Sequence, residues 1–365
     1  MPSPRRLAFG ALGLCGLLYL TAGAAAQTLL NLPFGLWFTE VFIFLGVTWV
    51  LIRFSGRLPV AYTRLESPGA LPPLTGFGLG VVNYFALVIP LQALALRFSP
   101  SWLRNLAPDS SRIFEGQTTL ELALVLGAVS VAAPFCEEFF FRGVLQQGLS
   151  GPERRPVQAV VITALLFSVF HMDPVGFWAR VELGLLFGWL FLRSGSLWTN
   201  VLCHAGNNIT TTVLYLTLRG SQKNEGQLPL LPVLGMGAVG LCIMFGIWRL
   251  AQSHPVLLDA KVPPAPSVDP PPLRPLHRVA APWLLGAAAA LALLVAVDHR
   301  GIRLTTLDVL YPLPDESALD ARVRSEERAL VKLRSEVRRG HSPFKEYSRR
   351  RRALYASISP KRKPR

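Results

Sequence analysis

The sequence predicts an all-α protein, a polytopic bundle of transmembrane helices. Charged residues make up 16% of its 365 residues, whereas soluble domains carry about 25%, and the mean hydropathy is +0.39. The charges are clustered, so that long uncharged runs separate them. About 20 apolar residues cross the hydrocarbon core of a bilayer as a helix, which satisfies its own backbone hydrogen bonds.

Nine apolar segments are expected to form these helices. They cover residues 7–26, 34–54, 75–97, 118–147, 156–172, 175–193, 196–218, 228–250 and 279–298. About eight helices form the core, with a membrane-embedded domain over 34–250, and 279–298 is an extra C-terminal segment. The N-terminal region, 1–33, has the basic start, apolar middle and small-residue end of a signal peptide, so a span and a cleaved leader both remain open.

The C-terminal third has a different composition. Residues 251–278 are rich in proline and predict an extended linker. The tail covers 299–365, and its residues 301–365, with 17 Lys/Arg against 8 Asp/Glu, carry about +9 of the formal net charge of +15. Within it, 315–339 predicts a solvent-exposed helix and 348–365 a disordered basic end. Contact with anionic lipid headgroups and simple solvation of the tail both remain open, and no nucleic acid partner is expected.

Lys and Arg residues gather in alternate loops, beginning with Arg5 and Arg6, which places the N-terminus inside. Nine spans then leave the basic tail on the outer side, against the same rule. Either the tail is translocated or one segment does not span, so the tail is exposed to the cytosol or to the periplasm. The Ala/Leu/Arg/Pro-rich composition is typical of bacteria and predicts a multi-pass protein of the inner (plasma) membrane.

Charged residues interrupt the segment 118–147, at Glu137, Glu138 and Arg142. Such a side chain costs roughly 2.5–3.5 kcal/mol at the bilayer centre on insertion scales. Glu138 and Arg142 stand four residues apart and share a helix face, so an ion pair can neutralise this carboxylate. Glu137 points about 100° away, which leaves it free to face a cavity.

Two histidines, His171 and His204, fall in other predicted spans. Asn208 follows His204 by four residues and therefore shares its helix face. Polar groups inside a span indicate function by default, although His and Asn also join helices in membrane bundles. Arg180 and Glu182 are expected to form an interfacial pair, with lining of a cavity as the alternative, and Glu40 and Glu121 to lie at headgroup level.

These residues fall in three short motifs. EEFFFR has the pattern EExxxR, FSVFH the pattern FxxxH, and HAGNN the pattern HxxxN, in that order. The chain thereby resembles the CAAX-protease and bacteriocin-processing family, intramembrane endopeptidases related to the type II CAAX prenyl endopeptidase. The resemblance covers residues 118–218 and extends more loosely over 34–250.

The resemblance implies a role for each residue. Glu137 and His171 would hold and deprotonate the attacking water, and His204 and Asn208 would stabilise the oxyanion. Glu138 and Arg142 would support them. A divalent metal such as Zn, held by Glu137, His171 and His204, is one implied cofactor, and a metal-free mechanism fits the same residues.

The implied function is hydrolysis of a peptide bond at the membrane surface. The implied substrate is a membrane-associated peptide or a lipidated protein, with the lipid bilayer as surroundings. Intramembrane carboxylates and histidines also occur in transporters and proton relays, which remain an alternative. An inactive immunity or scaffold protein of the same fold is a second alternative.

Overall fold

The computed structural model describes residues 3–106, 113–114, 118–150, 155–218, 229–259, 275–313 and 321–358. All regular elements in these ranges are helices, as the sequence predicts. The chain divides into two compact units. The core unit comprises 1–20 and 39–283, and the C-terminal unit comprises 21–38 and 284–365.

The core unit holds most of the helices, several of them joined end to end through wider π-helical turns. They are α1 (Pro4–Leu18), η3 (Thr39–Val47), α3 (Thr48–Phe54), α4 (Pro59–Tyr62), α5 (Leu71–Asn83), η4 (Tyr84–Val88), α6 (Ile89–Phe98), α7 (Ser101–Arg104), α8 (Thr119–Gly127), η6 (Ala128–Ala132), α9 (Ala133–Phe140), η7 (Phe141–Gln146), α10 (Gln147–Ser150), α11 (Pro156–Phe170), α12 (Phe177–Ser194), α13 (Leu197–Leu218), α14 (Leu230–Ser253) and the short 3₁₀ helix η8 (Pro255–Leu257).

The remaining elements belong wholly or in part to the C-terminal unit. They are η1 (Tyr19–Gly23), η2 (Ala26–Leu30), α2 (Leu32–Phe38), α15 (Leu276–Leu310), α16 (Ala321–Arg339) and α17 (Phe344–Ile358). Both ends of the chain sequence therefore contribute helices to one unit.

Six continuous helices in the described part of the chain are long and apolar enough to cross a membrane. They are Pro4–Leu30, Leu32–Phe54, Leu71–Phe98, Thr119–Ser150, Leu230–Ser253 and Leu276–Leu310. The other three predicted spans coincide with α11, α12 and α13. Helix α11 is apolar but has 15 residues, α12 carries three charged residues, and α13 carries His204 and several Asn and Thr residues. Every predicted segment is thus helical, and these three are too short or too polar to qualify.

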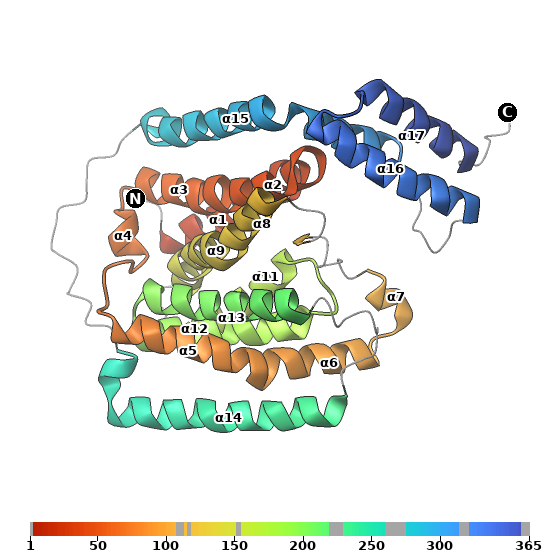
Figure 1. Ribbon diagram of the computed structural model, residues 1–365. Coiled ribbons are helices and arrows are strands. Elements are labelled where there is room, and N and C mark those ends of the chain that lie inside the picture. The colour runs from red at the N-terminus through yellow and green to blue at the C-terminus, as the bar shows by residue number, and fades with distance from the viewer. Residues whose placement is uncertain are drawn as a thin grey trace, which may run out of the picture. The chain divides into compact units, whose positions relative to one another are not determined.

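Helices α5 and α13 lie side by side (Figure 1), because three glycines let their backbones meet. A Cβ on Gly76 or Gly80 of α5 would collide with the carbonyl oxygens of Thr199 and Cys203, respectively, and one on Gly206 of α13 with that of Phe77. Small residues four apart allow this close approach in membrane proteins. The contact fixes the helix that carries the HAGNN motif.

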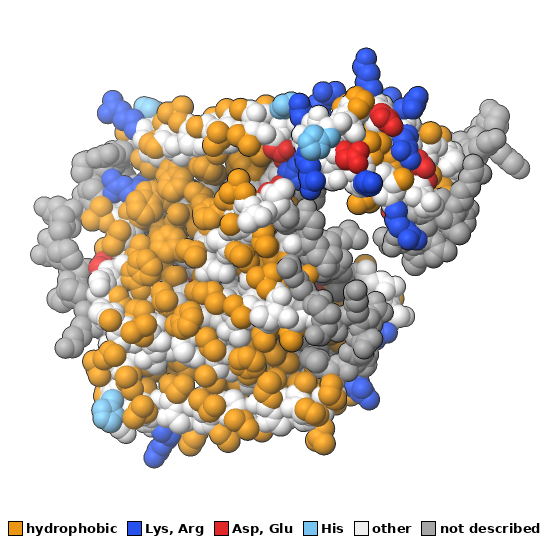
Figure 2. All heavy atoms as spheres, in the orientation of Figure 1, with side chains coloured by type: hydrophobic (Ala, Val, Ile, Leu, Met, Phe, Trp, Pro, Cys, Tyr) orange, Lys and Arg blue, Asp and Glu red, His pale blue; other side chains and the backbone are white. Residues whose placement is uncertain are grey.

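The C-terminal unit has its own apolar core. The buried residues are Leu304, Leu307, Leu330, Leu333, Val337, Tyr347 and Leu354, contributed by the end of α15 and by α16 and α17. Figure 2 shows that charged side chains gather on the outer faces of α16 and α17. Residues 321–339 are helical as predicted, but one face of α16 is buried rather than exposed to solvent.

The prediction of a disordered end over 348–365 is wrong for residues 348–358, which continue α17. Tyr347 and Leu354 stand seven residues apart on one face and are both buried, so apolar packing holds this arginine-rich helix. Residues 359–365, and 260–274 of the predicted proline-rich linker, lie outside the described residues.

Asp298 interrupts α15, where the backbone leaves helical geometry at φ −126° and ψ 35°. Its carboxylate accepts hydrogen bonds from three parts of the C-terminal unit: Asn31 Nδ2 at 3.1 Å, Gly301 N at 3.1 Å and Arg338 Nη2 at 2.6 Å. The kink is therefore held by partners before and after it in the chain.

The contact between α5 and α13 gives a test of the packing. Gly80→Val is expected to lower the free energy of unfolding by about 1–3 kcal/mol or more, because the new side chain collides with the Cys203 carbonyl. Gly78→Val is the matched control, since a Cβ at Gly78 meets no atom within 4 Å. Thermal unfolding in detergent measures both, and equal losses in the two variants would contradict the packing described.

Candidate active site

The three motifs lie on three helices of the core unit. Glu137 and Glu138 are in α9, and Arg142 follows in η7, which continues the same helix. His171 caps the C-terminus of α11, and His204 and Asn208 lie in the middle of α13. Side-chain contacts join these helices into one site.

Glu138 and Arg142 form a fully buried ion pair. Arg142 Nη1 donates to Glu138 Oε1 at 2.7 Å, and Arg142 Nη2 donates to the Gly184 carbonyl at 3.2 Å. The spacing of four residues in the sequence predicts this ion pair, and the structure confirms it. That the pair supports the catalytic residues stays a prediction. Desolvating both charges is expensive, and the guanidinium recovers part of that energy through charge-assisted hydrogen bonds.

Two glycines of α12 make this arrangement possible. A Cβ on Gly184 would press against Ala164 of α11, and one on Gly188 against Val160 and Gln146. The bare backbone at these positions also accepts hydrogen bonds, since Gln146 Nε2 donates to the Gly188 carbonyl at 2.9 Å. The EEFFFR helix is thereby fastened to α12.

His204 contacts the same carboxylate oxygen, with its Nδ1 at 3.1 Å from Glu138 Oε1. An ionised carboxylate accepts hydrogen bonds and does not donate them, so Nδ1 carries the proton. Glu138 therefore holds both Arg142 and His204, a contact across helices that spacing along one helix does not predict.

His171 is oriented by its own helix. Its Nδ1 lies 2.8 Å from the Phe167 carbonyl oxygen, which accepts from it. In a neutral ring, a proton on Nδ1 leaves Nε2 as a hydrogen-bond acceptor. A neutral His171 therefore presents a basic Nε2, the atom that a general base or a metal ligand uses.

Phe167, the first residue of the FSVFH motif, contacts all three motifs. Its ring centroid lies 4.8 Å from that of His171 and 5.8 Å from that of His204, and Arg142 Cζ lies 4.8 Å from it. Phe187 of α12 completes the aromatic wall, because it stacks on His204 at 4.9 Å. The two rings shield the ion pair and hold the histidines in place.

Glu137 is buried, and its Oε2 has no hydrogen-bond partner among the described residues. It is close enough to His204 for their charges to interact. An unpaired buried carboxylate oxygen is costly in a folded protein. Glu138 Oε2 is likewise unpaired among the described residues, but Glu138 Oε1 is engaged twice, by Arg142 and by His204.

Asn208 has partners of its own. Its Nδ2 donates to the Val129 carbonyl of η6 at 2.9 Å, and its Oδ1 accepts from Asn207 Nδ2 at 3.1 Å. One of its two amide hydrogens is therefore committed to η6, and its role in binding an oxyanion stays a prediction.

A third buried carboxylate is that of Glu40, whose expected position at headgroup level stays a prediction. Glu40 lies in η3 with Oε2 unpaired among the described residues, and it is close enough to Glu137 for the two charges to interact. Helix η3 packs on α9, with the Phe44 and Phe140 rings 5.4 Å apart. The available signal was a single carboxylate flanked on both sides by the apolar runs FGLWFT and VFIFLG.

Arg180 and Glu182 do not pair with each other. Arg180 Nη1 binds Asp173 Oδ2 at 2.7 Å, and Glu182 Oε2 accepts from Asn83 Nδ2 at 3.0 Å. Burial alone would raise the pKa of Asp173, but the Gly176 N–H and the Arg180 guanidinium hold it below its ordinary value. The ionised Asp173 fastens the loop that directly follows His171.

A divalent metal at this site stays a prediction. Among the described residues, no three His, Cys, Asp or Glu side chains form a group that could hold one. This includes the predicted set of Glu137, His171 and His204.

The buried ion pair yields a stability test. Arg142→Met is expected to lower the free energy of unfolding by about 3–5 kcal/mol, because it leaves the Glu138 charge buried without its main partner. Adding Glu138→Gln removes that charge and should recover more than half of the loss. Thermal unfolding in detergent measures both variants, and a double variant no more stable than the single one would contradict this account.

Comparison with known proteins gives two matches. Residues 119–210 match the family model described as type II CAAX prenyl endopeptidase Rce1-like. An uncharacterized protein of Bacillus subtilis (strain 168), YyaK, is 26% identical over 185 residues, which cover 48% of this chain and 58% of that protein. The chain thus matches less than two thirds of the length of this relative. No solved structure matches.

The matched region contains all seven residues that the three motifs specify, Phe167 among them. The family is one of endopeptidases, which indicates a hydrolase. Together with the six apolar helices, the match makes the chain an integral, multi-pass membrane protein. Residues 119–210 are thus similar to the Rce1-like family of type II CAAX prenyl endopeptidases.

Proposed function

We propose that the chain is an intramembrane endopeptidase that hydrolyses a peptide bond at the membrane surface, with water activated by Glu137 and His171. The observation that carries the proposal is the unpaired, buried Oε2 of Glu137, in a site where both histidines are oriented through Nδ1. Its position inside the segment matched to an endopeptidase family supports the same reading.

In this mechanism the Glu137 carboxylate accepts a proton from water while the water oxygen attacks the carbonyl carbon of the substrate. His171 Nε2 accepts the second hydrogen bond of that water and orients it. The tetrahedral intermediate then collapses with cleavage of the C–N bond, and Glu137 returns the proton to the departing amine. One carboxylate therefore serves as general base and then as general acid.

The oxyanion requires donors. His204 already donates from Nδ1 to Glu138, so it can donate from Nε2 as well only when the ring carries both protons. The Glu138 carboxylate, 3.1 Å away, compensates the charge of that ring. We therefore assign His204 to stabilisation of the oxyanion, together with the remaining amide hydrogen of Asn208.

The substrate class follows from the surroundings of the site. The catalytic residues lie on helices of a membrane protein, which favours a membrane-associated peptide or a lipidated protein. A divalent metal such as Zn remains a separate hypothesis, testable by metal analysis of the purified protein.

Glu137→Gln tests the function. Loss of the general base is expected to lower the rate of cleavage by about 10²–10⁴-fold while the protein remains folded. Peptides released from membranes that contain the wild type or the variant, compared by mass spectrometry, provide the measurement. Glu121→Gln is the matched control, because Glu121 is a buried carboxylate at the start of the same continuous helix, in the cap of α8. Wild-type peptide release by a folded Glu137→Gln variant would overturn the proposal.

The two histidines are expected to differ in their effects. His204→Ala should lower the rate constant of the chemical step by about 10²–10³-fold, as removal of an oxyanion donor does. His171→Ala should reduce the same step and leave substrate capture unchanged. Single-turnover cleavage and a separate binding measurement with each variant check both expectations. Loss of binding without loss of chemistry would contradict them.

The same variants address the alternatives. A transporter or proton relay predicts solute or proton flux in liposomes that is lost in a His171 variant. An inactive scaffold predicts that a Glu137, His171 double variant replaces the wild type fully in cells.

A further inference from the structure

The apolar part of α15 ends at a cluster of basic residues. Its side chains before the kink face outward, with Leu284 67% and Val297 74% exposed, as expected of a helix that contacts lipid. Asp298 breaks the helix, and His299, Arg300 and Arg303 follow within five residues. Basic residues directly beyond an apolar span lie at the level of the lipid headgroups.

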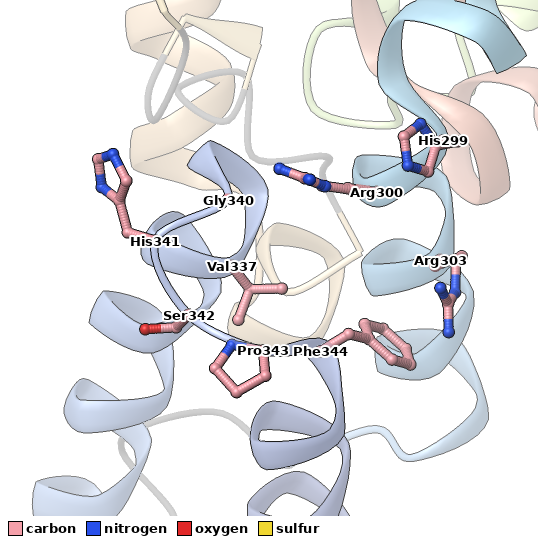
Figure 3. A pocket seen from close by; sticks show the side chains of 9 residues that line it. All are labelled: His299, Arg300, Arg303, Val337, Gly340, His341, Ser342, Pro343 and Phe344. Atoms are coloured by element: carbon pink, nitrogen blue, oxygen red, sulfur yellow. The ribbon is translucent and has the colours of Figure 1, made fainter.

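These residues line a cavity of about 430 Å³ in the C-terminal unit. Figure 3 shows its two walls: α15 supplies His299, Arg300 and Arg303, and the turn between α16 and α17 supplies the other side. The remaining lining residues are Val337, Gly340, His341, Ser342, Pro343 and Phe344.

Uncharged groups of the turn lie close to both guanidinium groups. Gly340, at φ +83°, ends α16, and a Cβ there would collide with the Arg300 guanidinium. Arg303 Cζ lies 4.2 Å from the centroid of the Phe344 ring, a cation–π contact. Figure 3 shows Arg300 reaching toward Gly340 and Arg303 lying beside Phe344. The shape of the turn thus positions two guanidinium groups without neutralising them.

Three acidic residues of the unit pair with other arginines. Asp308 binds Arg334 and Arg351, Asp298 binds Arg338, and Glu326 binds Arg350. Within the described residues, Arg300 and Arg303 have no carboxylate partner. Unpaired guanidinium groups on a fixed surface attract phosphate, which they bind in bidentate geometry.

Further positive charge surrounds the pair. A second cavity, of about 460 Å³, shares Arg303 and Phe344 and is also lined by Lys345, Arg349 and Arg352. The 15-residue helix α17 begins at Phe344, and its N-terminus favours an anion. Glu346, in the first turn, and Glu336, which accepts from Ser342, offset part of this charge, and the five basic side chains exceed them.

We propose that this pocket binds the phosphate of an anionic phospholipid headgroup, such as that of phosphatidylglycerol. Arg300 and Arg303 bind the phosphate, and the exposed apolar face of α15, next to the pocket, contacts the acyl chains. The proposal concerns the C-terminal unit and does not depend on the proteolytic function of the core unit.

The test uses the full-length protein in neutral detergent, titrated by calorimetry with dihexanoyl phosphatidylglycerol. Arg300→Gln/Arg303→Gln is expected to raise the Kd by about tenfold or more, since each basic residue near a lipid surface contributes several-fold. The matched control, Arg328→Gln/Lys332→Gln, removes two exposed charges of α16 that line neither cavity and should change the Kd by less than about twofold.

Two further ligands distinguish the source of the phosphate. Dihexanoyl phosphatidylcholine and inorganic phosphate should each bind at least about tenfold more weakly than phosphatidylglycerol. Equal losses in the double variant and its control would overturn the proposal, as would phosphatidylcholine binding as tightly as phosphatidylglycerol. If inorganic phosphate bound as tightly as phosphatidylglycerol, the ligand of the pocket would be free phosphate and the lipid proposal would be overturned. Thermal unfolding verifies that the variants fold, and each single variant, expected to raise the Kd about threefold, gives an independent test.

Discussion

The carboxylate of Glu138 is the group on which the arrangement of the site depends. Its Oε1 binds the Arg142 guanidinium on the same helix and the His204 ring on another. Arg142 in turn reaches the Gly184 carbonyl of α12, so one ion pair fixes the mutual positions of three helices. Because all of these groups are buried, each needs the others to offset its desolvation. The site is therefore organised by charge before any substrate enters.

Aromatic packing sets the second constraint. Phe167 and Phe187 both lie within about 5 Å of the Arg142 guanidinium and both contact the His204 ring. A cation held against aromatic faces is stabilised in the absence of water, and the flat rings restrict the orientation of the imidazoles. Phe167, the apolar residue of the FSVFH motif, therefore helps to orient the ring nitrogens of His171 and His204.

Features that depend on one helix could be predicted from the sequence, and features that depend on several could not. The Glu138–Arg142 pair follows from a spacing of four residues. The contact between Glu138 and His204 spans 66 residues of chain and requires the packing of α9 against α13. The hydropathy pattern gave the position of Glu40 along its apolar segment. It did not show that the helix face with Glu40 packs against α9. In α17, a run of four arginines masked the apolar face formed by Tyr347 and Leu354.

Asp298 lies at the centre of a connection between residues far apart in the chain. Its hydrogen bond to Asn31 spans 267 residues, and its bonds to Arg338 span 40. During synthesis, the segment that contains Asn31 leaves the ribosome before most of the protein has been made, whereas Arg338 is among the last residues to appear. Contacts of such large sequence separation form late. Asn31 can therefore pair with Asp298 only after most of the chain has been translated, and a chain cut short before α16 would lack the Arg338 guanidinium that neutralises Asp298.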